Sequence, residues 1–215
     1  MIRVVIADDH TIVREGLRQI LAAEGDIEVV AEAIDGHEVQ ARVRALDFDV
    51  LVLDMSMPGK SGVELIRQVK TERPKLRIVV LTMHQENQYA VRAIKAGASG
   101  YLTKDGASAQ LVQAIRKVAA GGAWISAEVA EQLAHQAHGA GPASPHEALT
   151  DREFQVLRLL VSGAPLTGIG TDLHLSVKTI STHKSRILEK LGLANQTELI
   201  RYAIAHGLGD PLDRA

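Results

Sequence analysis

Polar side chains suited to phosphoryl and metal chemistry follow several short hydrophobic runs in this sequence. The runs and the side chains after them are 4–7 with Asp8 and Asp9, 50–53 with Asp54, 78–81 with Thr82, and 101–103 with Lys104. Short runs rich in β-branched residues are typical of strands in a parallel sheet that is buried on both faces. Because ligands of such sheets bind beyond the carboxyl ends of the strands, we expect all five side chains at one edge.

Three carboxylates gathered at one edge repel one another, by about 4 kcal/mol per pair at a separation of about 4 Å and an effective dielectric constant of about 20. Such a cluster either raises the pKa of a member or recruits a cation. Mg²⁺ suits it because this ion takes oxygen ligands and bridges to phosphate oxygens. One carboxylate can then attack a phosphoryl donor, with Lys104 and the Thr82 hydroxyl stabilising phosphoryl charge. Each residue alone would be interpreted as a helix cap, but the five together favour a phosphoryl site.

The segments between the hydrophobic runs have helical periodicity. Residues 1–122 therefore contain five strand–helix units, which predict an α/β fold with a five-stranded doubly wound parallel sheet. Residues 123–147 are expected to be a linker with a possible helix at 125–138 and an end rich in Gly and Pro. Only helical patterns follow, so residues 148–215 are expected to form a small all-α domain.

Residues 1–122 resemble the receiver domain of bacterial two-component response regulators, which has a CheY-like fold. The residues that carry the resemblance are Asp8, Asp9, Asp54, Met57-Pro58-Gly59, Thr82, Tyr101 and Lys104. The resemblance implies that Asp54 accepts a phosphoryl group from a sensor histidine kinase. It also implies that Asp9, Asp54 and the main-chain carbonyl of Ser56 bind Mg²⁺. Asp8 would assist through a water molecule.

The same resemblance implies a switch pair, in which the Thr82 hydroxyl is drawn toward the phosphoryl group and the Tyr101 ring moves inward. Ser56 and His84 stand at positions that tune the lifetime of the phosphoryl group in such domains. One departure is Asp105, which stands where many receivers have proline, so a cis-proline turn is not expected there.

Three histidines invite a metal-binding interpretation. His10 follows the acidic pair, and we expect it to begin the first helix rather than to bind metal. His135 and His138 are three residues apart on the possible linker helix but lack a third partner, so we expect them to be solvated.

Residues 166–191 have the pattern of two short helices joined by a tight turn. We expect Ser176 to cap the second helix and Gly192 to end it, and Thr150 with Glu153 to form the capping box of an earlier helix. A second helix with basic and small polar residues suits a recognition helix in the major groove of DNA. A small helical bundle without DNA-binding function would show the same spacing, so the pattern alone leaves both interpretations open.

The C-terminal segments 149–157, 175–180 and 189–192 resemble the LuxR-type helix-turn-helix. Together the two halves resemble NarL/FixJ-type response regulators along nearly the whole chain. By position, the groove-facing residues of that family are Ser181, Thr182 and Ser185. The candidates for phosphate contacts, which position without specifying a sequence, are Lys178, Thr179, Lys184 and Arg186. Residues 197–205 correspond to the dimer helix of the family.

The first helix of the motif departs from the family pattern, because segment 163–170 holds glycine where polar residues are usual. Gly168 and Gly170 inside a short helix cost about 1 kcal/mol each relative to alanine. A basic residue that would touch phosphate is also missing. We therefore expect a soft first helix, weak DNA binding by a monomer, and tighter binding when Gly168 and Gly170 are replaced by Glu and Ala.

Composition excludes several other classes of protein. The 215 residues carry 24 Lys and Arg against 26 Asp and Glu, so the chain is not a general polyanion binder. The absence of cysteine excludes disulfides and thiolate metal sites. No run approaches the 18 or more apolar residues of a membrane span, so we expect a cytoplasmic protein with no membrane contact.

These observations predict a two-component response regulator. Phosphorylation of Asp54 by a sensor histidine kinase would control homodimerisation and sequence-specific binding to a roughly two-fold promoter site in double-stranded DNA. The only reaction catalysed by the chain would be its own phosphoryl transfer. One alternative is a constitutive DNA-binding regulator with a vestigial receiver, although no site residue is missing. The other is a Mg²⁺-dependent aspartate phosphohydrolase, which normally needs a second carboxylate where Ser56 stands.

Overall fold

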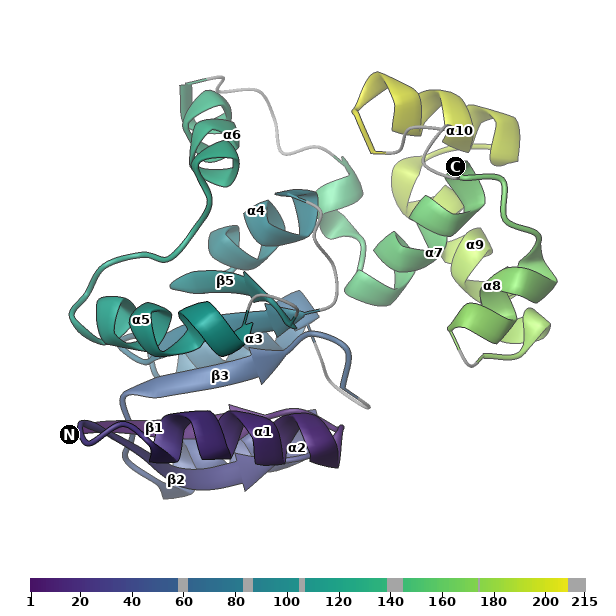
Figure 1. The fold of residues 1–215 in the computed structure, drawn as a ribbon. Helices are drawn as coiled ribbons and strands as arrows, with labels where there is room; N and C mark the ends of the chain where they lie inside the picture. Colours follow the sequence, from purple (N-terminus) through teal and green to yellow (C-terminus); the bar gives the residue numbers. More distant parts are fainter. Residues whose placement is uncertain (58–61, 83–86, 105–106, 139–144, 174, 209–215) are drawn as a thin grey trace. The chain divides into compact units, whose positions relative to one another are not determined.

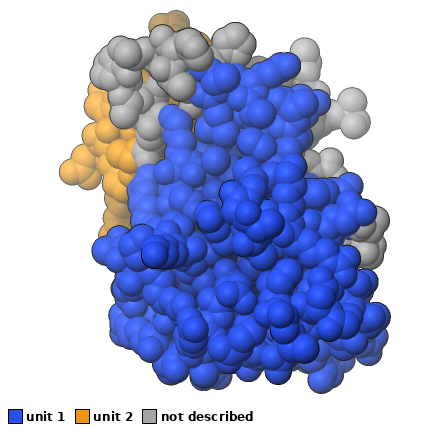
Figure 2. Space-filling view, turned by 90° about the vertical axis from the view of Figure 1, so that its left-hand side faces the viewer, with its two compact units in different colours: residues 1–140 blue, residues 141–215 orange. Residues whose placement is uncertain are grey.

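The computed structural model describes six stretches of the chain, to which the following statements refer. They are residues 1–57, 62–82, 87–104, 107–138, 145–173 and 175–208. The chain divides into two compact units, Met1–Ala140 and Gly141–Ala215 (Figures 1 and 2). Each unit is described by itself. Pro58, Gly59, His84 and Asp105 lie outside the described residues, as do the side chains of the two linker histidines.

The first unit is built on a five-stranded sheet in the order β2-β1-β3-β4-β5. Its strands are β1 (Ile2–Ala7), β2 (Ile27–Ala33), β3 (Val50–Asp54), β4 (Arg77–Thr82) and β5 (Gly100–Thr103). Every neighbouring pair is parallel. The hydrophobic runs of the sequence therefore are strands of a parallel sheet, and all their carboxyl ends lie along one edge.

Helices cover both faces of this sheet (Figure 1). The five helices are α1 (Thr11–Ala22), α2 (Gly36–Ala45), α3 (Gly62–Glu72), α4 (Asn87–Lys95) and α5 (Ala107–Ala119). Alternate strand residues face opposite sides, so Val4 and Ile6 pack with residues of α1 and α5, whereas Val5 and Ala7 pack with residues of α2, α3 and α4. This arrangement confirms the predicted doubly wound sheet.

A further helix follows the sheet within the same unit. Trp124 forms a β-bridge with Gly100, and α6 (Ala127–His138) comes next. Val129 of α6 is 3% exposed and packs in one cluster with Ala90 and Val91 of α4. The helix is thus held by apolar contacts to the rest of the first unit.

The second unit contains only helical elements among its described residues. They are the 3₁₀ turn η2 (Pro145–Ala148), α7 (Asp151–Val161), α8 (Leu166–Asp172), α9 (Val177–Leu191) and α10 (Gln196–Ala205). Thr150 and Glu153 make the predicted capping box at the start of α7. The Ser176 side chain caps α9 by accepting a hydrogen bond from Thr179 N, and Gly192 ends that helix in the left-handed conformation with φ 66°.

The expectation that Gly170 only weakens the first helix of the motif is wrong. A Cβ on Gly170 would lie 2.7 Å from the carbonyl oxygen of Leu175, because α8 approaches the turn before α9 closely. Leu175 N also donates a hydrogen bond of 2.8 Å to the Gly170 carbonyl. A Cβ on Gly168 would meet only Pro165 side-chain atoms at ordinary contact distance, 3.5 Å and beyond. Gly170 is therefore a packing requirement rather than a weakness, and only Gly168 is replaceable without a clash.

Candidate functional site

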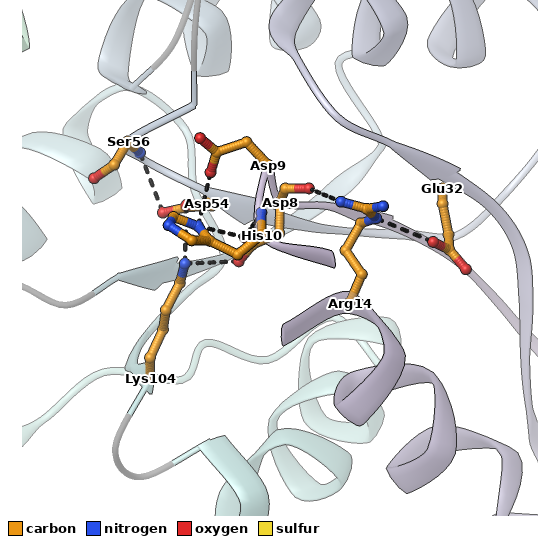
Figure 3. Close-up of polar contacts among 8 residues, drawn as sticks. All are labelled: Asp8, Asp9, His10, Arg14, Glu32, Asp54, Ser56 and Lys104. Atoms are coloured by element: carbon orange, nitrogen blue, oxygen red, sulfur yellow. Dashed lines mark hydrogen bonds and ion pairs between the residues drawn. The ribbon is translucent and has the colours of Figure 1, made fainter. Parts of the chain in front are cut away.

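Three strand ends bring the acidic residues and the lysine together at the carboxyl edge of the sheet (Figure 3). Lys104, after β5, places Nζ 2.7 Å from Asp8 Oδ2 and 2.9 Å from Asp54 Oδ2. The side chains of Asp8 and Asp54 are each 1% exposed, and that of Lys104 is 10% exposed. A largely enclosed lysine thus bridges two buried carboxylates, as the ends of the hydrophobic runs predict.

The pKa values of the bridged groups follow from burial and pairing. Burial raises the pKa of Asp54 above its ordinary value, and the pairing with Lys104 offsets only part of this increase. Burial alone would lower the pKa of Lys104, but its hydrogen bonds with Asp8 and Asp54 raise it instead. Lys104 is therefore cationic at neutral pH, while the carboxylates around it exceed its single charge.

Asp54 is held by its own backbone as well as by Lys104. Asp54 Oδ1 accepts a hydrogen bond of 3.1 Å from Ser56 N, and the Ser56 side chain is exposed. The main-chain N–H after the strand thus fixes one carboxylate oxygen and leaves the other facing Lys104. A carboxylate held in this way presents a defined oxygen to an incoming electrophile.

His10 is a member of the cluster, although the sequence predicts only that it begins the first helix. It precedes α1 as the N-cap residue, as expected, but its side chain makes no capping hydrogen bond. The ring instead turns toward the carboxylates, with Nδ1 2.9 Å from Asp9 Oδ1 and 3.1 Å from Asp8 Oδ1. Arg14 also supports the edge, because its Nη1 donates to the Asp8 carbonyl at 2.8 Å.

The donor set at this edge fits a divalent cation. Asp8, Asp9, His10 and Asp54 each offer one ligand atom, and these four atoms all lie within 4.8 Å of one another. Asp9 Oδ1 is shielded from solvent yet accepts no hydrogen bond. Carboxylate oxygens crowded in this way, with one lacking a donor, are the ligands that hard divalent cations take.

The two residues of the expected switch pair lie on the neighbouring strands β4 and β5. Thr82 ends β4 and is fully buried. Tyr101 is half-buried on β5 and packs against both the sheet core and the α4–α6 cluster around Val129. Tyr101 thus links the sheet to the apolar cluster that holds α6.

The exposed face of α9 carries most of the predicted DNA-contacting side chains. Those exposed to solvent are Lys178, Ser181, Thr182, Ser185 and Arg186. Thr179 and Lys184 are only partly exposed and have partners within the unit: Thr179 Oγ1 lies 2.8 Å from Ser176 Oγ, and Lys184 Nζ donates to Gln196 Oε1 at 2.7 Å. These two side chains therefore support the cap of α9 and its contact with α10.

An ion pair near the C-terminal end of α9 anchors this helix to α7. Lys190 Nζ lies 2.6 Å from Glu153 Oε2, and the Glu153 side chain is 4% exposed. Burial would raise the pKa of Glu153, but the hydrogen bonds from Lys190 and Thr150 lower it below its ordinary value. The capping box of α7 and the orientation of α9 therefore depend on the same carboxylate.

Comparison with known proteins identifies both units. Residues 4–116 match the response regulator receiver domain family, and residues 147–203 match the luxR family of bacterial regulatory proteins. The response regulator GacA of Pseudomonas protegens is 38% identical over 210 residues, which are 98% of this chain and 99% of GacA. The chain belongs to the NarL/FixJ-type response regulators. This finding confirms the prediction of a two-component transcription regulator and its fold class.

Further similar proteins show the same agreement over both units. The response regulator UvrY of Escherichia coli (strain K12) is 37% identical over 209 residues, which are 97% of this chain and 96% of UvrY. A solved structure of the response regulator RcsB from Salmonella typhimurium is 32% identical, with a TM-score of 0.58 and coverage of 95% of this chain and 98% of RcsB. A solved RcsB–DNA complex matches with the same identity and TM-score. Among the described residues of this response regulator, no helix is long and apolar enough to cross a membrane.

Proposed function

We propose that Asp54 is the phosphoacceptor of this response regulator and receives its phosphoryl group from a sensor histidine kinase. The observation that carries the proposal is the buried Asp54 carboxylate, paired with Lys104 at 2.9 Å in a cluster of excess negative charge. An Asp54 carboxylate oxygen would attack phosphorus, forming the acyl phosphate as the bond from phosphorus to the kinase's phosphohistidine nitrogen breaks. Lys104 would then shift from the Asp54 carboxylate to a phosphoryl oxygen and neutralise its charge.

Asp8, Asp9, Asp54 and the main-chain carbonyl of Ser56 would hold Mg²⁺ at this site. Mg²⁺ bound there would supply positive charge that offsets the carboxylates and the incoming phosphoryl group. Asp9 Oδ1, which accepts no hydrogen bond, is available for a direct ligand bond. Asp8 is already engaged by Lys104 at 2.7 Å, which suits a role through a water molecule.

Thr82 and Tyr101 would transmit phosphorylation to the rest of the chain. The Thr82 hydroxyl at the end of β4 would bond to the phosphoryl group, and the half-buried Tyr101 ring would move into the space released. Such a two-state element is biased by a local change in charge. In this division of labour, residues 1–122 receive the signal, 123–147 connect, and 148–215 bind DNA.

The helix α9 would lie in the major groove of double-stranded DNA in the cytoplasm. Ser181, Thr182 and Ser185 would face the bases, and the exposed Lys178 and Arg186 would contact phosphates. Thr179 and Lys184 would take part in phosphate contact only by exchanging their present partners. Residues 197–205 would form the homodimer contact on a roughly two-fold site. The existence of a solved RcsB–DNA complex supports this proposal.

Treatment of the full chain with acetyl phosphate and Mg²⁺ tests the proposal. Intact-mass spectrometry should show one added phosphoryl group on the wild type and none on Asp54→Asn. Binding to a two-fold site selected from random DNA should tighten on phosphorylation of the wild type alone. DNA binding by a chain that takes up no phosphoryl group would instead favour a constitutive regulator with a vestigial receiver. Continuous phosphate release without a phosphoprotein would favour a phosphohydrolase.

A further inference from the structure

His10 takes no part in the phosphoryl chemistry proposed for the acidic edge, yet its ring is directed at it (Figure 3). His10 Nδ1 lies 2.9 Å from Asp9 Oδ1 and 3.1 Å from Asp8 Oδ1. The rest of the side chain is open to solvent, with 63% of its surface exposed. One imidazole nitrogen is therefore brought to two carboxylate oxygens while the ring remains accessible from outside.

The local backbone accounts for this orientation. His10 is the N-cap residue of α1, but its side chain makes no hydrogen bond to the first turn. Its main-chain N–H instead donates to Asp8 Oδ1 at 2.8 Å, which ties the backbone of His10 to the carboxylate that its own ring approaches. The ring position therefore results from the turn that joins β1 to α1.

The distances from His10 Nδ1 to the two carboxylate oxygens match those between neighbouring ligands on one cation. A metal ion with ligand bonds of about 2.1 Å holds adjacent octahedral ligands about 3 Å apart. The two Nδ1–oxygen distances are 2.9 and 3.1 Å, and Asp8, Asp9, His10 and Asp54 each offer one ligand atom within 4.8 Å of the others. A proton on Nδ1 serves only the contact with Asp8 Oδ1, whereas a metal ion at the Nδ1 lone pair would also engage Asp9 Oδ1, which accepts no hydrogen bond.

We propose that His10 Nδ1 is a further metal ligand, which makes the acidic site a binding site for divalent transition metals such as Ni²⁺ as well as for Mg²⁺. The inference rests on the metal site proposed above and adds a nitrogen to its oxygen ligands. Imidazole suits Zn²⁺, Ni²⁺ and Cu²⁺, whereas Mg²⁺ takes oxygen ligands and retains water. His10 therefore strengthens the binding of Zn²⁺, Ni²⁺ and Cu²⁺ more than the binding of Mg²⁺.

Calorimetric titration of the full chain with Ni²⁺ and, separately, with Mg²⁺ tests the inference. The variant His10→Gln should weaken Ni²⁺ binding by about tenfold or more, and it should weaken Mg²⁺ binding by a smaller factor. The matched control is His37→Gln, which removes an exposed histidine near the start of α2 and should leave both affinities unchanged. The variant Asp9→Asn tests whether Ni²⁺ binds at the acidic edge, because it should abolish the Ni²⁺ binding that depends on His10.

Equal Ni²⁺ affinity in the wild type and His10→Gln would overturn the inference, as would Ni²⁺ binding that survives Asp9→Asn. Phosphorylation of the wild type with acetyl phosphate and Mg²⁺, compared with Asp54→Asn, reports on the proposed function independently. If His10→Gln binds Ni²⁺ as tightly as the wild type while phosphorylation of the wild type is observed, only the role of His10 is rejected. Failure of phosphorylation together with failure of Mg²⁺ binding rejects the phosphoryl site itself.

Discussion

Asp9 contributes negative charge to an edge where Lys104 is the cation paired with Asp8 and Asp54. Without a divalent cation, Asp9→Asn should therefore raise the free energy of unfolding of the receiver unit by relieving like-charge repulsion. The wild type should gain about 2.7 kcal/mol at a Mg²⁺ concentration one hundred times Kd, and Asp9→Asn should gain much less.

Fluorescence of Trp124, the single tryptophan of the chain, follows unfolding of that unit alone. Denaturant titrations with Mg²⁺ and with a chelator supply the comparison for each variant. Equal stabilisation of both proteins by Mg²⁺ would show that Asp9 is not a ligand.

Two glycines of α8 have opposite structural roles. Gly168→Ala should stabilise the second unit by about 1 kcal/mol through helix propensity, since its Cβ meets Pro165 only at ordinary contact distance. Gly170→Ala should destabilise it by about 1–3 kcal/mol, because the new Cβ would lie 2.7 Å from the Leu175 carbonyl oxygen. The second unit contains no tryptophan, so its unfolding changes the circular dichroism but not the tryptophan fluorescence. Circular dichroism of that transition measures the stability change of both variants. The same sign for both variants would contradict the close approach of α8 to the turn.

At the scale of elements, α6 is held to α4 by a small apolar cluster. Val129→Ala removes two buried carbon groups from it and should weaken the docking of α6 by about 1.6 kcal/mol. Hydrogen exchange should accelerate in α6 while the strands of the sheet keep their protection. The matched control is Glu131→Ala, at an exposed position of the same helix. Similar acceleration in the control would show that loss of any side chain of α6, rather than loss of the apolar contact of Val129, loosens the helix.

The packing of α9 on α7 depends on ionised Glu153. Its pKa is lowered in the folded chain by Lys190 and Thr150 against the effect of burial. The stabilisation is therefore complete above the unfolded value of about 4.3 and is lost as the pH falls through the folded pKa. Glu153→Gln should destabilise the second unit at neutral pH, and the difference from the wild type should shrink below about pH 4.3. Circular dichroism melts across pH 3–7 check this, and a difference independent of pH would rule out the ion pair as its origin.

At the scale of the whole molecule, the features that the sequence predicts are those set by local periodicity. Strand runs such as 50–53 are recognisable because both of their faces are buried, and Ser176 and Gly192 mark helix ends through their own backbone chemistry. The position of the His10 ring and the requirement for Gly170 depend on contacts made after the chain turns back on itself. No periodic pattern in the sequence encodes such contacts. The contact of the His10 ring affects which groups can bind metal at the acidic edge, and the contact of Gly170 sets how closely α8 packs on the turn before α9.

The proposed homodimer predicts how strongly salt weakens DNA binding. Each phosphate contact contributes about 0.9 to the slope of log affinity against log salt concentration. A substitution in a homodimer removes two such contacts, so Lys178→Ala and Arg186→Ala should each lower the slope of the phosphorylated protein by about two. Lys75→Ala, an exposed lysine of the receiver unit, should leave it unchanged. Ser181→Ala should alter sequence preference with little effect on slope, because base contacts specify and phosphate contacts position. A slope lowered by only about one would mean that a single copy of α9 engages DNA, and the two-fold arrangement would then be wrong.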